Sequence, residues 1–543
     1  MDKYTIGIDF GTLSARALMV RINDGSEVAS AEYVYPHAIM TEKDIDGSEN
    51  IVTTALQHPK DYIDALSYTV KKVLSDSAVD ASCVLGLGID FTSCTVLPVK
   101  KDLTPLCFDD EFKKNKHAYV KLWKHHGAND VANRMTDIAK SSGEKWLDDY
   151  GGAVSSEWLI PKITETLERS ESVYNAAEYF MDAGDWLVSL ITGKVSRSCC
   201  IAGFKAQWNA QSGHLSDEYL QKVNAKLKGL TKTKLKGDVL PVGICAGKLN
   251  EYGAKLTSLN ENTSVSVAVI DAHAALPSAG VTESGALMLI LGTSACHILL
   301  SKKDVKIGGI CGKVLDGVVK GYYAYESGQG CFGDVFDWFK KTCVPNEYFE
   351  NAKVENVDIF TYLNKKAKDI PIGNSGLLAL DWFNGNRSPY ADYDLSGMIL
   401  GLNLSTTPEE IYQALVCSVV FGTKRIVDLY VENGLDVDKI TAAGGIAGKN
   451  DYLMQVMADV LGKKISVVDN KQAGAKGSAI YAAAACGYYD SVKSAADTMK
   501  DGVSRVYLPN SAHTERYEKL YKHYVELSEY FAKSNSVMKK LKF

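Results

Sequence analysis

The sequence predicts an α/β protein of two related lobes with a cleft between them. The chain has 543 residues, which is more than one core supports, because single cores stop growing near about 250 to 300 residues. A strand, a glycine turn and a second strand occur at the amino terminus and again near the middle of the chain. Helical stretches follow both copies, so the whole pattern indicates a duplicated α/β unit.

The first strand pattern occupies residues 4–22. Apolar and polar residues alternate in YTIGIDF (4–10) and ARALMVRI (15–22), as half-buried strands require, and a Gly-Thr turn joins them. A helix is expected at about residues 60–76. Residues 84–100 (VLGLGIDFTSCTVLPVK) then predict a second hairpin, with small hydroxyl residues at its turn.

The same pattern returns in residues 264–300. The strand SVSVAVI ends just before Asp271, and the hairpin ALMLILGTSACHILLS begins after Gly285. The turn residues of the first hairpin are echoed in this one: Gly11, Thr12 and Ser14 by Gly292, Thr293 and Ser294. This duplication predicts an amino-terminal lobe over residues 1–281 and a carboxyl-terminal lobe over residues 282–543.

The second lobe ends in helices. A long helix is expected at about residues 407–434, and an Ala-rich helix in AGAKGSAIYAAAACG (473–487), whose small residues permit close packing. The last helix carries an apolar and aromatic face at helical spacing, made of Tyr517, Leu520, Tyr521, Tyr524 and Leu527. Such a face packs either inside the lobe or at a homodimer interface.

Composition excludes several classes of function. The net charge is −6, from 60 basic and 66 acidic residues, so the dense basic face of a nucleic-acid-binding protein is not indicated. No stretch approaches the roughly 20 apolar residues that span a bilayer, and MDKYTIGIDF lacks the layout of a signal peptide. A cytoplasmic protein is expected. The 12 cysteines are scattered, without zinc-ligand spacing, and are interpreted as reduced core thiols.

The two glycine turns are candidate phosphate-binding elements. Glycine lets the backbone approach a phosphate closely, and the hydroxyls and amides of Gly11, Thr12 and Ser14 supply donors. Asp9, at the end of the first strand, is placed to hold Mg²⁺ directly or through water. One such turn is more often an ordinary hairpin. A second turn at Gly292, Thr293 and Ser294 favours two turns that hold a triphosphate from both sides of a cleft.

Two further groups of candidate binding residues each follow a predicted strand. Asp271 lies at the carboxyl end of a strand, where ligands collect in open α/β sheets, although it equally suits the cap of the helix that follows. Gly444, Gly445, Lys449 and Asn450 lie in a glycine loop between a strand and a helix. A loop without side chains lets the backbone lie against a base and ribose, or makes a tight connection.

In this order the segments resemble the actin, Hsp70 and sugar kinase superfamily, which has ribonuclease H-like lobes of the actin-like ATPase type. SSEWLIPKITETLE (155–168) and DAGDWLVSLITGK (182–194) are similar to signatures of the FGGY family of carbohydrate kinases. Within that family, the chain resembles the ribulokinase members. The segments that carry this resemblance are HAYVKLWKHHGA (117–128), AGFKAQWN (202–209), ESGQGCFGDVFDWF (326–339) and LLALDWFNGNRSP (377–389).

The resemblance implies transfer of the γ-phosphate of ATP to the 5-hydroxyl of L-ribulose, which gives L-ribulose 5-phosphate in L-arabinose catabolism. It implies that Asp271 is the catalytic base and that Asp9 is the carboxylate on the Mg²⁺ side. Trp123, Lys205 and Glu326 are implied to hold the ketose, with Ser93 in the sugar-side turn. ATP, Mg²⁺ and a ketopentose are thus the expected cofactors and partners.

Other interpretations stay open at this stage. Trp123 also suits the core of an amphipathic helix, and Glu326 suits the end of a strand. His125 and His126 are adjacent on that same expected helix, where neighbouring side chains diverge, so no metal site is predicted there. The rival functions are an FGGY kinase for another pentulose, such as D-ribulose or a xylulose, and an actin-like or chaperone-like nucleotide switch.

Overall fold

The computed structural model describes residues 2–48 and 54–541. The chain divides into two compact units. Unit 1 comprises Met1–Glu283, Gly312–Ala324 and Gln472–Asp501, and unit 2 comprises Ser284–Cys311, Tyr325–Lys471 and Gly502–Phe543. The sequence predicts one division near residue 281. The chain changes unit close to that point, and two later segments then return to unit 1.

The large sheet of unit 1 has the order β11-β12-β5-β1-β2-β3, and β13 also pairs with β5. Strand β1 pairs in parallel with β5 and antiparallel with β2, which confirms the amino-terminal hairpin. The strands are β1 (Tyr4–Phe10), β2 (Ser14–Arg21), β3 (Glu27–Val34), β5 (Val84–Phe91), β11 (Cys245–Lys248), β12 (Ser264–Ser266) and β13 (Val269–Ile270).

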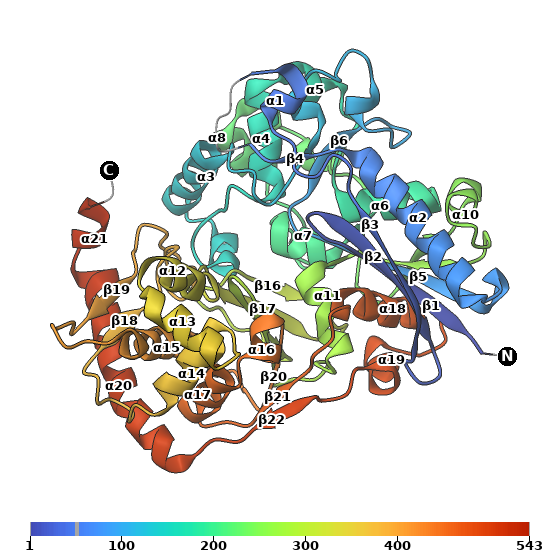
Figure 1. The fold of residues 1–543 in the computed structure, drawn as a ribbon. Coiled ribbons are helices and arrows are strands. Elements are labelled where there is room, and N and C mark those ends of the chain that lie inside the picture. The colour runs from blue at the N-terminus through green and yellow to red at the C-terminus, as the bar shows by residue number, and fades with distance from the viewer. Residues whose placement is uncertain (1, 49–53, 542–543) are drawn as a thin grey trace. The chain divides into compact units, whose positions relative to one another are not determined.

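Two helices cover opposite faces of this sheet (Figure 1). On one face, α2 (Pro59–Ser77) packs on β2 and β3, and Tyr62 contacts the stacked rings of Phe10 and Phe91. On the other face, α18 (Ala473–Ala485) packs on β1 and β5. Because side chains alternate between the faces of a strand, Asp9 points to the α18 side while its neighbour Phe10 points to α2.

Residues 84–100 do not form the predicted hairpin. Strand β6 (Val96–Val99) joins a separate sheet of order β4-β7-β6-β8. The reason is that β5 already pairs with β1 on one side and with β12 and β13 on the other, so no edge is left for β6. The chain turns away at residues 92–95, where Cys94 has a φ of 59°. The other strands are β4 (Leu56–Gln57), β7 (Val120–Lys121) and β8 (Tyr179–Asp182).

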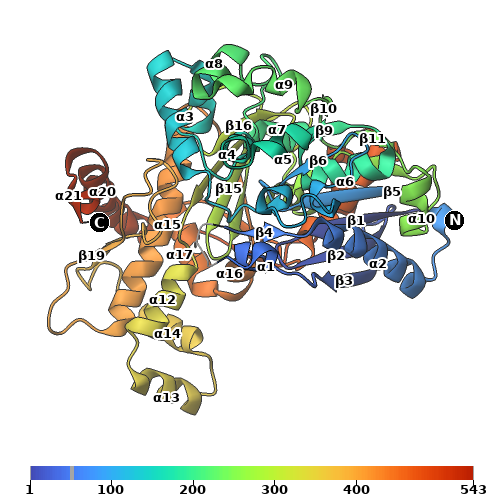
Figure 2. The ribbon, with the colours of Figure 1, turned by 90° about the horizontal axis from the view of Figure 1, so that it is seen from above.

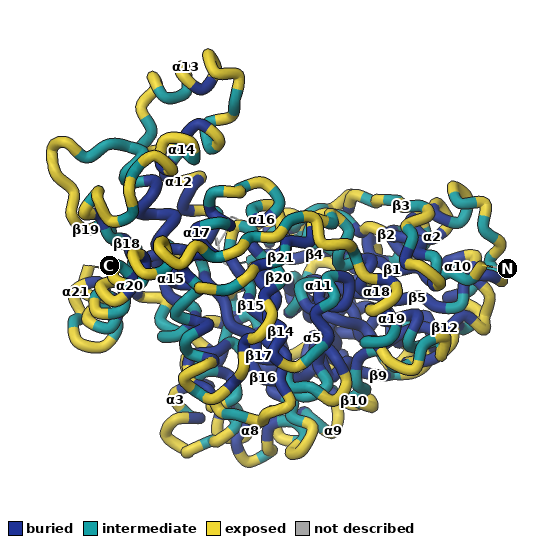
Figure 3. Tube along the Cα trace, turned by 90° about the horizontal axis from the view of Figure 1, so that it is seen from below, coloured by how far each residue is buried: buried dark blue, intermediate teal, exposed yellow. Residues whose placement is uncertain are grey.

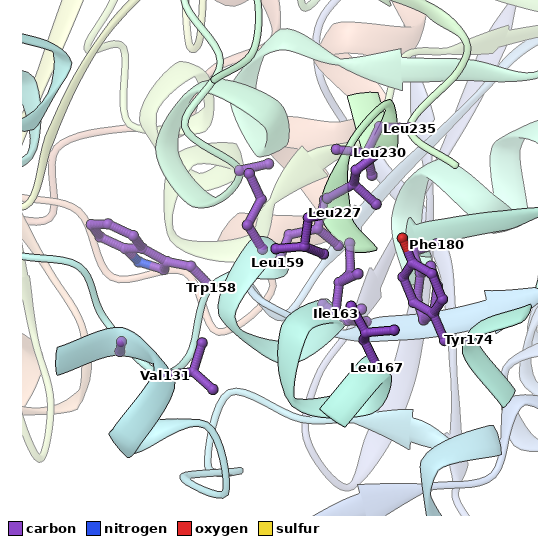
Figure 4. Close-up of a cluster of buried hydrophobic side chains, with 14 of the residues drawn as sticks. Val131, Trp158, Leu159, Ile163, Leu167, Tyr174, Phe180, Leu227, Leu230 and Leu235 are labelled. Atoms are coloured by element: carbon purple, nitrogen blue, oxygen red, sulfur yellow. The ribbon is translucent and has the colours of Figure 1, made fainter. Parts of the chain in front are cut away.

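Helix α4 (Leu159–Arg169) lies in the core next to this smaller sheet. Leu159, Ile163 and Leu167, one turn apart, line one side of the helix (Figure 4). The core includes residues from α3 (Asn129–Ser142) and from the chain around residues 215–235. The segment 117–128, expected as an amphipathic helix, is not one: it contains the end of a short 3₁₀ turn, strand β7 and a further turn.

Unit 2 contains the strand path β17-β15-β14-β20-β21-β22. Its hairpin β14–β15 lies beside the parallel strand β20, as β1–β2 lies beside β5, and this shared pattern confirms the predicted duplication. The strands are β14 (Ala286–Leu291), β15 (Ala295–Ser301), β17 (Tyr323–Gln329), β20 (Lys439–Ala443), β21 (Ile465–Val467) and β22 (Arg505–Tyr507).

Helix α15 (Pro408–Glu432) is the long helix expected in this unit, and a capping box of Thr407 and Glu410 begins it. Helix α20 (Ser511–Glu529) packs on it: Tyr517, Tyr521 and Tyr524 are buried and contact Phe421 of α15. The three tyrosines of the predicted face thus pack internally. Leu520 and Leu527 of the same face instead line an open groove of about 510 Å³.

Three shorter helices of unit 2 precede α15 in the sequence. Figure 2 shows α12 (Asp334–Thr342) and α14 (Ile359–Lys368) near α15, with α13 (Asn346–Val354) beyond them. Figure 3 shows buried residues concentrated in the central strands of each unit and an exposed surface on α13. No helix within residues 2–48 and 54–541 is long and apolar enough to cross a membrane.

Candidate functional site

Three carboxylates gather at the carboxyl ends of the central strands of unit 1. Asp9 of β1 is opposite Asp90 of β5 in the parallel register. Strand β13 pairs with β5 at Val269 and Ile270, so Asp271 follows at the same edge. Asp271 is the first residue of helix α11 (Asp271–Ser278), and its Oδ1 accepts a hydrogen bond of 2.7 Å from the Ala272 amide. The strand-end interpretation of Asp271 therefore holds, whereas the cap interpretation is wrong, because the N-cap residue is Ile270 and Asp271 is the first residue inside the helix.

Burial and mutual repulsion set the electrostatics of this group. Burial raises the pKa of Asp9 above its ordinary value, against the opposing effects of the adjacent Asp90 carboxyl and the charge of Arg16. The pKa of Asp90 is raised well above the ordinary value by burial first, then by the charge of Asp9, with Asp271 adding to it. The hydroxyl of Ser478 on α18 donates to Asp90 Oδ2 at 2.6 Å and partly offsets this.

Asp90 is the residue of this group that the sequence analysis missed. The tetrapeptide GIDF occurs at residues 7–10 and again at residues 88–91. This repeat could have revealed Asp90, because two identical segments that pair in parallel without an offset have their aspartates side by side. The Oδ1 atom of Asp90 is buried and has no hydrogen-bond partner within the described residues, which is consistent with a cation or water beside it.

Aspartates 9 and 90 fit a magnesium site that relies on the substrate for most of its ligands. Within residues 2–48 and 54–541, no group of three or more His, Cys, Asp or Glu side chains is arranged to hold a metal ion. Mg²⁺ in nucleotide-binding enzymes commonly takes only one or two carboxylates, with waters and phosphate oxygens completing its shell. Asp9 and Asp90 can supply that number.

The first glycine turn joins β1 to β2. The Gly11 amide donates to the Ser14 carbonyl at 3.0 Å, and the Ser14 hydroxyl donates to Glu32 of β3 at 2.8 Å. Thr12 is held from two directions: its carbonyl accepts a hydrogen bond from Gln57, and its Oγ1 accepts one of 3.3 Å from the Trp123 indole. The Trp123 bond connects the predicted phosphate turn with a predicted sugar residue.

The predicted sugar residues of unit 1 lie on three neighbouring segments. Ser93 is in the turn after β5, Trp123 follows β7, and Lys205 ends helix α7 (Cys199–Lys205). Helix α7 contacts β13, which leads into Asp271. Burial raises the pKa of the Cys94 thiol to about 12 while the charge of Lys205 opposes the shift, so the ammonium lies near the Ser93 turn.

Glu326, the remaining predicted sugar residue, belongs to unit 2. It lies in the middle of β17 rather than at its end, and it is buried. Its carbonyl accepts a hydrogen bond of 2.7 Å from the Cys311 amide. His125 is buried against Glu165, with 2.9 Å between Nε2 and Oε2.

The second glycine turn and the glycine loop come together within unit 2. The Gly292 amide donates to the Ser294 carbonyl, and the Thr293 carbonyl accepts from Phe332 and Gly333, which precede α12. Gly444 has a φ of 101°, and a Cβ there would lie 2.5 Å from the Leu291 carbonyl at the end of β14. Only glycine suits this position. The predicted loop is instead a short helix, α16 (Gly445–Lys449), which begins directly after Gly444, and the side chain of the following Asn450 caps α17 (Asp451–Leu461).

Comparisons with known proteins agree with this arrangement. The model of the FGGY family of carbohydrate kinases, N-terminal domain, matches residues 4–277, and that of the C-terminal domain matches residues 287–486. The chain is 44% identical to a ribulokinase of Halalkalibacterium halodurans, over 99% of this chain and 97% of the relative. It is 43% identical to a ribulokinase of Bacillus licheniformis, over 98% and 97%.

Solved structures have the same fold at lower sequence identity. The xylulose kinase from Rhodospirillum rubrum superposes with a TM-score of 0.79 at 20% identity, covering 97% of this chain and 98% of that one. The Plasmodium falciparum glycerol kinase with ADP superposes with a TM-score of 0.75 at 16% identity, covering 97% and 98%. With both halves of the chain matched by the family models and with full-length relatives above 40% identity, this protein belongs to the FGGY family of carbohydrate kinases.

Proposed function

We propose that this protein transfers the γ-phosphate of ATP to the 5-hydroxyl of L-ribulose and forms L-ribulose 5-phosphate for L-arabinose catabolism. The similarity to ribulokinases along nearly the whole chain supports this choice of substrate. The observation that carries the chemistry is the placement of Asp271 beside Asp9 and Asp90, at the carboxyl ends of adjacent parallel strands. Such an edge is where α/β folds collect ligands.

Each carboxylate has a distinct role in the proposal. Asp271 accepts the proton of the 5-hydroxyl as the phosphoryl group transfers. Asp9, directly or through water and with Asp90 beside it, would hold Mg²⁺, which neutralises phosphate charge when bound. A cation there would also favour the ionised forms of two carboxyls whose pKa values burial raises.

The other predicted residues bind and orient the two substrates. Backbone amides and hydroxyls of Gly11, Thr12 and Ser14 hold phosphate from unit 1, and those of Gly292, Thr293 and Ser294 hold it from unit 2. Gly444, Gly445, Lys449 and Asn450 receive the adenosine. Ser93, Trp123, Lys205 and Glu326 hold the ketose. Positioning and electrostatics then supply most of the rate, as in other phosphoryl transfers.

The test is ADP release from Mg-ATP with a panel of L-ribulose, D-ribulose, L-xylulose, D-xylulose, ribitol and glycerol. L-ribulose should give the strongest stimulation. Asp271→Asn should lower kcat by about 100- to 10,000-fold, the usual contribution of a general base. The matched control is Asp76→Asn on the surface of α2, where the carboxylate pairs with Lys72, and it should keep full activity.

The outcomes separate the rival functions. Preferential stimulation by another pentulose would transfer the assignment to that sugar. ATP hydrolysis that ignores every sugar would favour a nucleotide switch. An Asp271→Asn protein with wild-type kcat would remove Asp271 from the base role while leaving the kinase assignment in place.

A further inference from the structure

Lys162 is a fully buried lysine on α4, with 0% of its surface exposed. Its ammonium donates to the carbonyl oxygens of Cys94 at 2.6 Å, Leu122 at 2.6 Å and Lys121 at 3.3 Å. The three acceptors satisfy the three N–H donors of the side chain. All three belong to the backbone of two segments that lie far apart in the sequence.

A buried ammonium is an expensive way to fill a core. Taking the charge out of water is unfavourable, and a methionine of similar length would fill the space without that penalty. Charge-assisted hydrogen bonds to carbonyls recover part of it and fix the geometry of the acceptors. Lys162 therefore orders the backbone of the two segments in a way that an apolar side chain cannot.

The two segments are those that carry predicted sugar residues. Cys94 follows Ser93, and its φ of 59° is a conformation that a residue with a Cβ rarely adopts. Leu122 directly precedes Trp123, whose indole reaches Thr12 of the phosphate turn. One ammonium thus joins the Ser93 turn to the Trp123 segment, and Trp123 extends this connection to the phosphate turn.

A second buried lysine, Lys121, lies on the Trp123 segment itself and donates hydrogen bonds from that segment to α4. Lys121 donates to the Lys162 carbonyl at 3.2 Å, to Glu165 Oε2 at 2.7 Å and to Thr166 Oγ1 at 2.7 Å. His125 also contacts Glu165. The segment from Lys121 to His125 is consequently bonded to α4 at both ends, and Trp123 lies between the two attachments.

We propose that Lys162 is a positioning residue for the sugar: through the carbonyls of Cys94 and Leu122 it sets the separation of the Ser93 turn and Trp123. The inference rests on the proposed kinase function, because it takes Ser93 and Trp123 as sugar contacts. It adds a residue that touches neither substrate. Lys162 bonds directly to the Ser93 turn and the Trp123 segment and is connected to the predicted phosphate turn indirectly, through Trp123, so its removal should affect sugar binding more than ATP binding.

The test is Lys162→Met, which keeps the chain length and removes all three donors. KM for the sugar should rise and kcat/KM for the sugar should fall about 100-fold, since small displacements of binding groups cost that much. KM for ATP should change by a much smaller factor than KM for the sugar, because Lys162 is connected to the predicted phosphate turn indirectly, through Trp123. Lys162→Gln, with two N–H donors, should fall between wild type and Lys162→Met and is the variant of choice if the methionine protein does not fold.

Lys234→Met is the matched control. Lys234 also donates to a backbone carbonyl, that of Ala177, and lies over the ring of Tyr174 in the same unit, but it holds no segment with a predicted sugar residue. Its loss should lower the melting temperature and leave the sugar KM unchanged. If the Lys162 variants lose stability while keeping the wild-type sugar KM, which is the behaviour expected of Lys234→Met, the positioning role is overturned.

Hydrogen exchange on the wild-type protein gives an independent answer. The sugar that stimulates ADP release should slow exchange both in peptides that cover residues 92–95 and in peptides that cover residues 120–125. Absence of protection in either segment would contradict the proposal even where no variant folds. A wild-type protein that no sugar stimulates would instead overturn the proposed function, so the two failures are distinguishable.

Discussion

Charged and titratable side chains are buried in unit 1 where they organise the candidate site. Asp90 is buried beside Asp9, Lys162 beneath the Ser93 turn, and Glu165 against Lys121. Burial, the largest single influence on Glu165, acts to raise its pKa, but the charge of Lys121 and the hydrogen bond with His125 overcome it and hold the pKa below its ordinary value. Each group has specific partners, as buried charges require. Burying these groups is unfavourable in solvation, and their hydrogen bonds and ion pairs fix the positions of the segments around the predicted sugar and phosphate turns.

The buried histidines make the protein sensitive to acid. Burial lowers the pKa of His117 to about 2 and that of His125 to about 4, whereas an unfolded histidine has a pKa near 6.5. Below pH 6.5 these histidines bind protons in the unfolded chain but not in the native state, so the free energy of unfolding falls as the pH falls. From pH 6.5 to pH 5, His117 alone should remove about 2 kcal/mol of unfolding free energy.

Calorimetry at pH 7.5 and pH 5.0 would measure this effect. The drop in melting temperature between the two values should be smaller in His117→Gln than in wild type. His523→Gln, at an exposed position on α20, is the control and should show the wild-type drop. Equal drops in all three proteins would mean that the charge state of His117 does not contribute.

At the scale of elements, helix α18 is fitted to the sheet and to α11 by glycines. A Cβ on Gly7 of β1 would lie 1.7 Å from the Ala475 carbonyl, and one on Gly88 of β5 would lie 1.9 Å from that of Ser478. Gly477 of α18 approaches the Ala274 carbonyl of α11 in the same way. The close approach brings Ser478 to Asp90 and sets the position of α11, which begins with Asp271.

Gly477→Ala should therefore be destabilising, although alanine is the better helix former by about 1 kcal/mol. The added Cβ would lie 1.7 Å from the Ala274 carbonyl, and overpacking of this kind typically costs about 1 to 3 kcal/mol. The melting temperature and kcat should fall together, because α11 must shift. Gly502→Ala, where a Cβ meets no atom within 4 Å, is the matched control, and parallel behaviour of the two variants would refute the packing argument.

At the scale of the whole molecule, the two compact units are not two halves of the chain. Residues 472–501, which contain α18, fold with unit 1 although they follow most of unit 2 in the sequence. The face of β1 and β5 that α18 covers is lined by glycines and by Asp9 and Asp90. Unit 1 therefore acquires an essential layer from the carboxyl-terminal part of the chain.

A fragment of residues 1–283 should accordingly not fold on its own, because the glycine-lined face of its sheet would remain uncovered. Joining residues 472–501 to it through a flexible linker should restore helical circular dichroism and a cooperative melting transition. The same fusion with Gly477→Leu is the control and should fail. A cooperative transition in the unmodified fragment would show that α18 is dispensable for this unit.

Local pattern was sufficient for much of this protein. Alternating strands, glycine turns and a repeated unit predicted the hairpins β1–β2 and β14–β15, the long helix α15 and the kinase family, because these depend on neighbouring residues or on contiguous motifs. The sequence also marked Asp271 at a strand end. Each of these features is encoded by residues that are close together in the sequence, so it can be predicted without knowledge of distant contacts.

Tertiary structure alone decided the rest. The parallel register of β1 and β5 places Asp90 beside Asp9. Strand β6 joins another sheet because both edges of β5 are already paired. Helix α18 packs in unit 1 through close contacts at glycines. Lys162 looks in the sequence like an ordinary helical lysine, yet its ammonium is buried among carbonyls from residues 94 and 122. Each of these outcomes depends on contacts between residues dozens to hundreds of positions apart, which local periodicity does not encode.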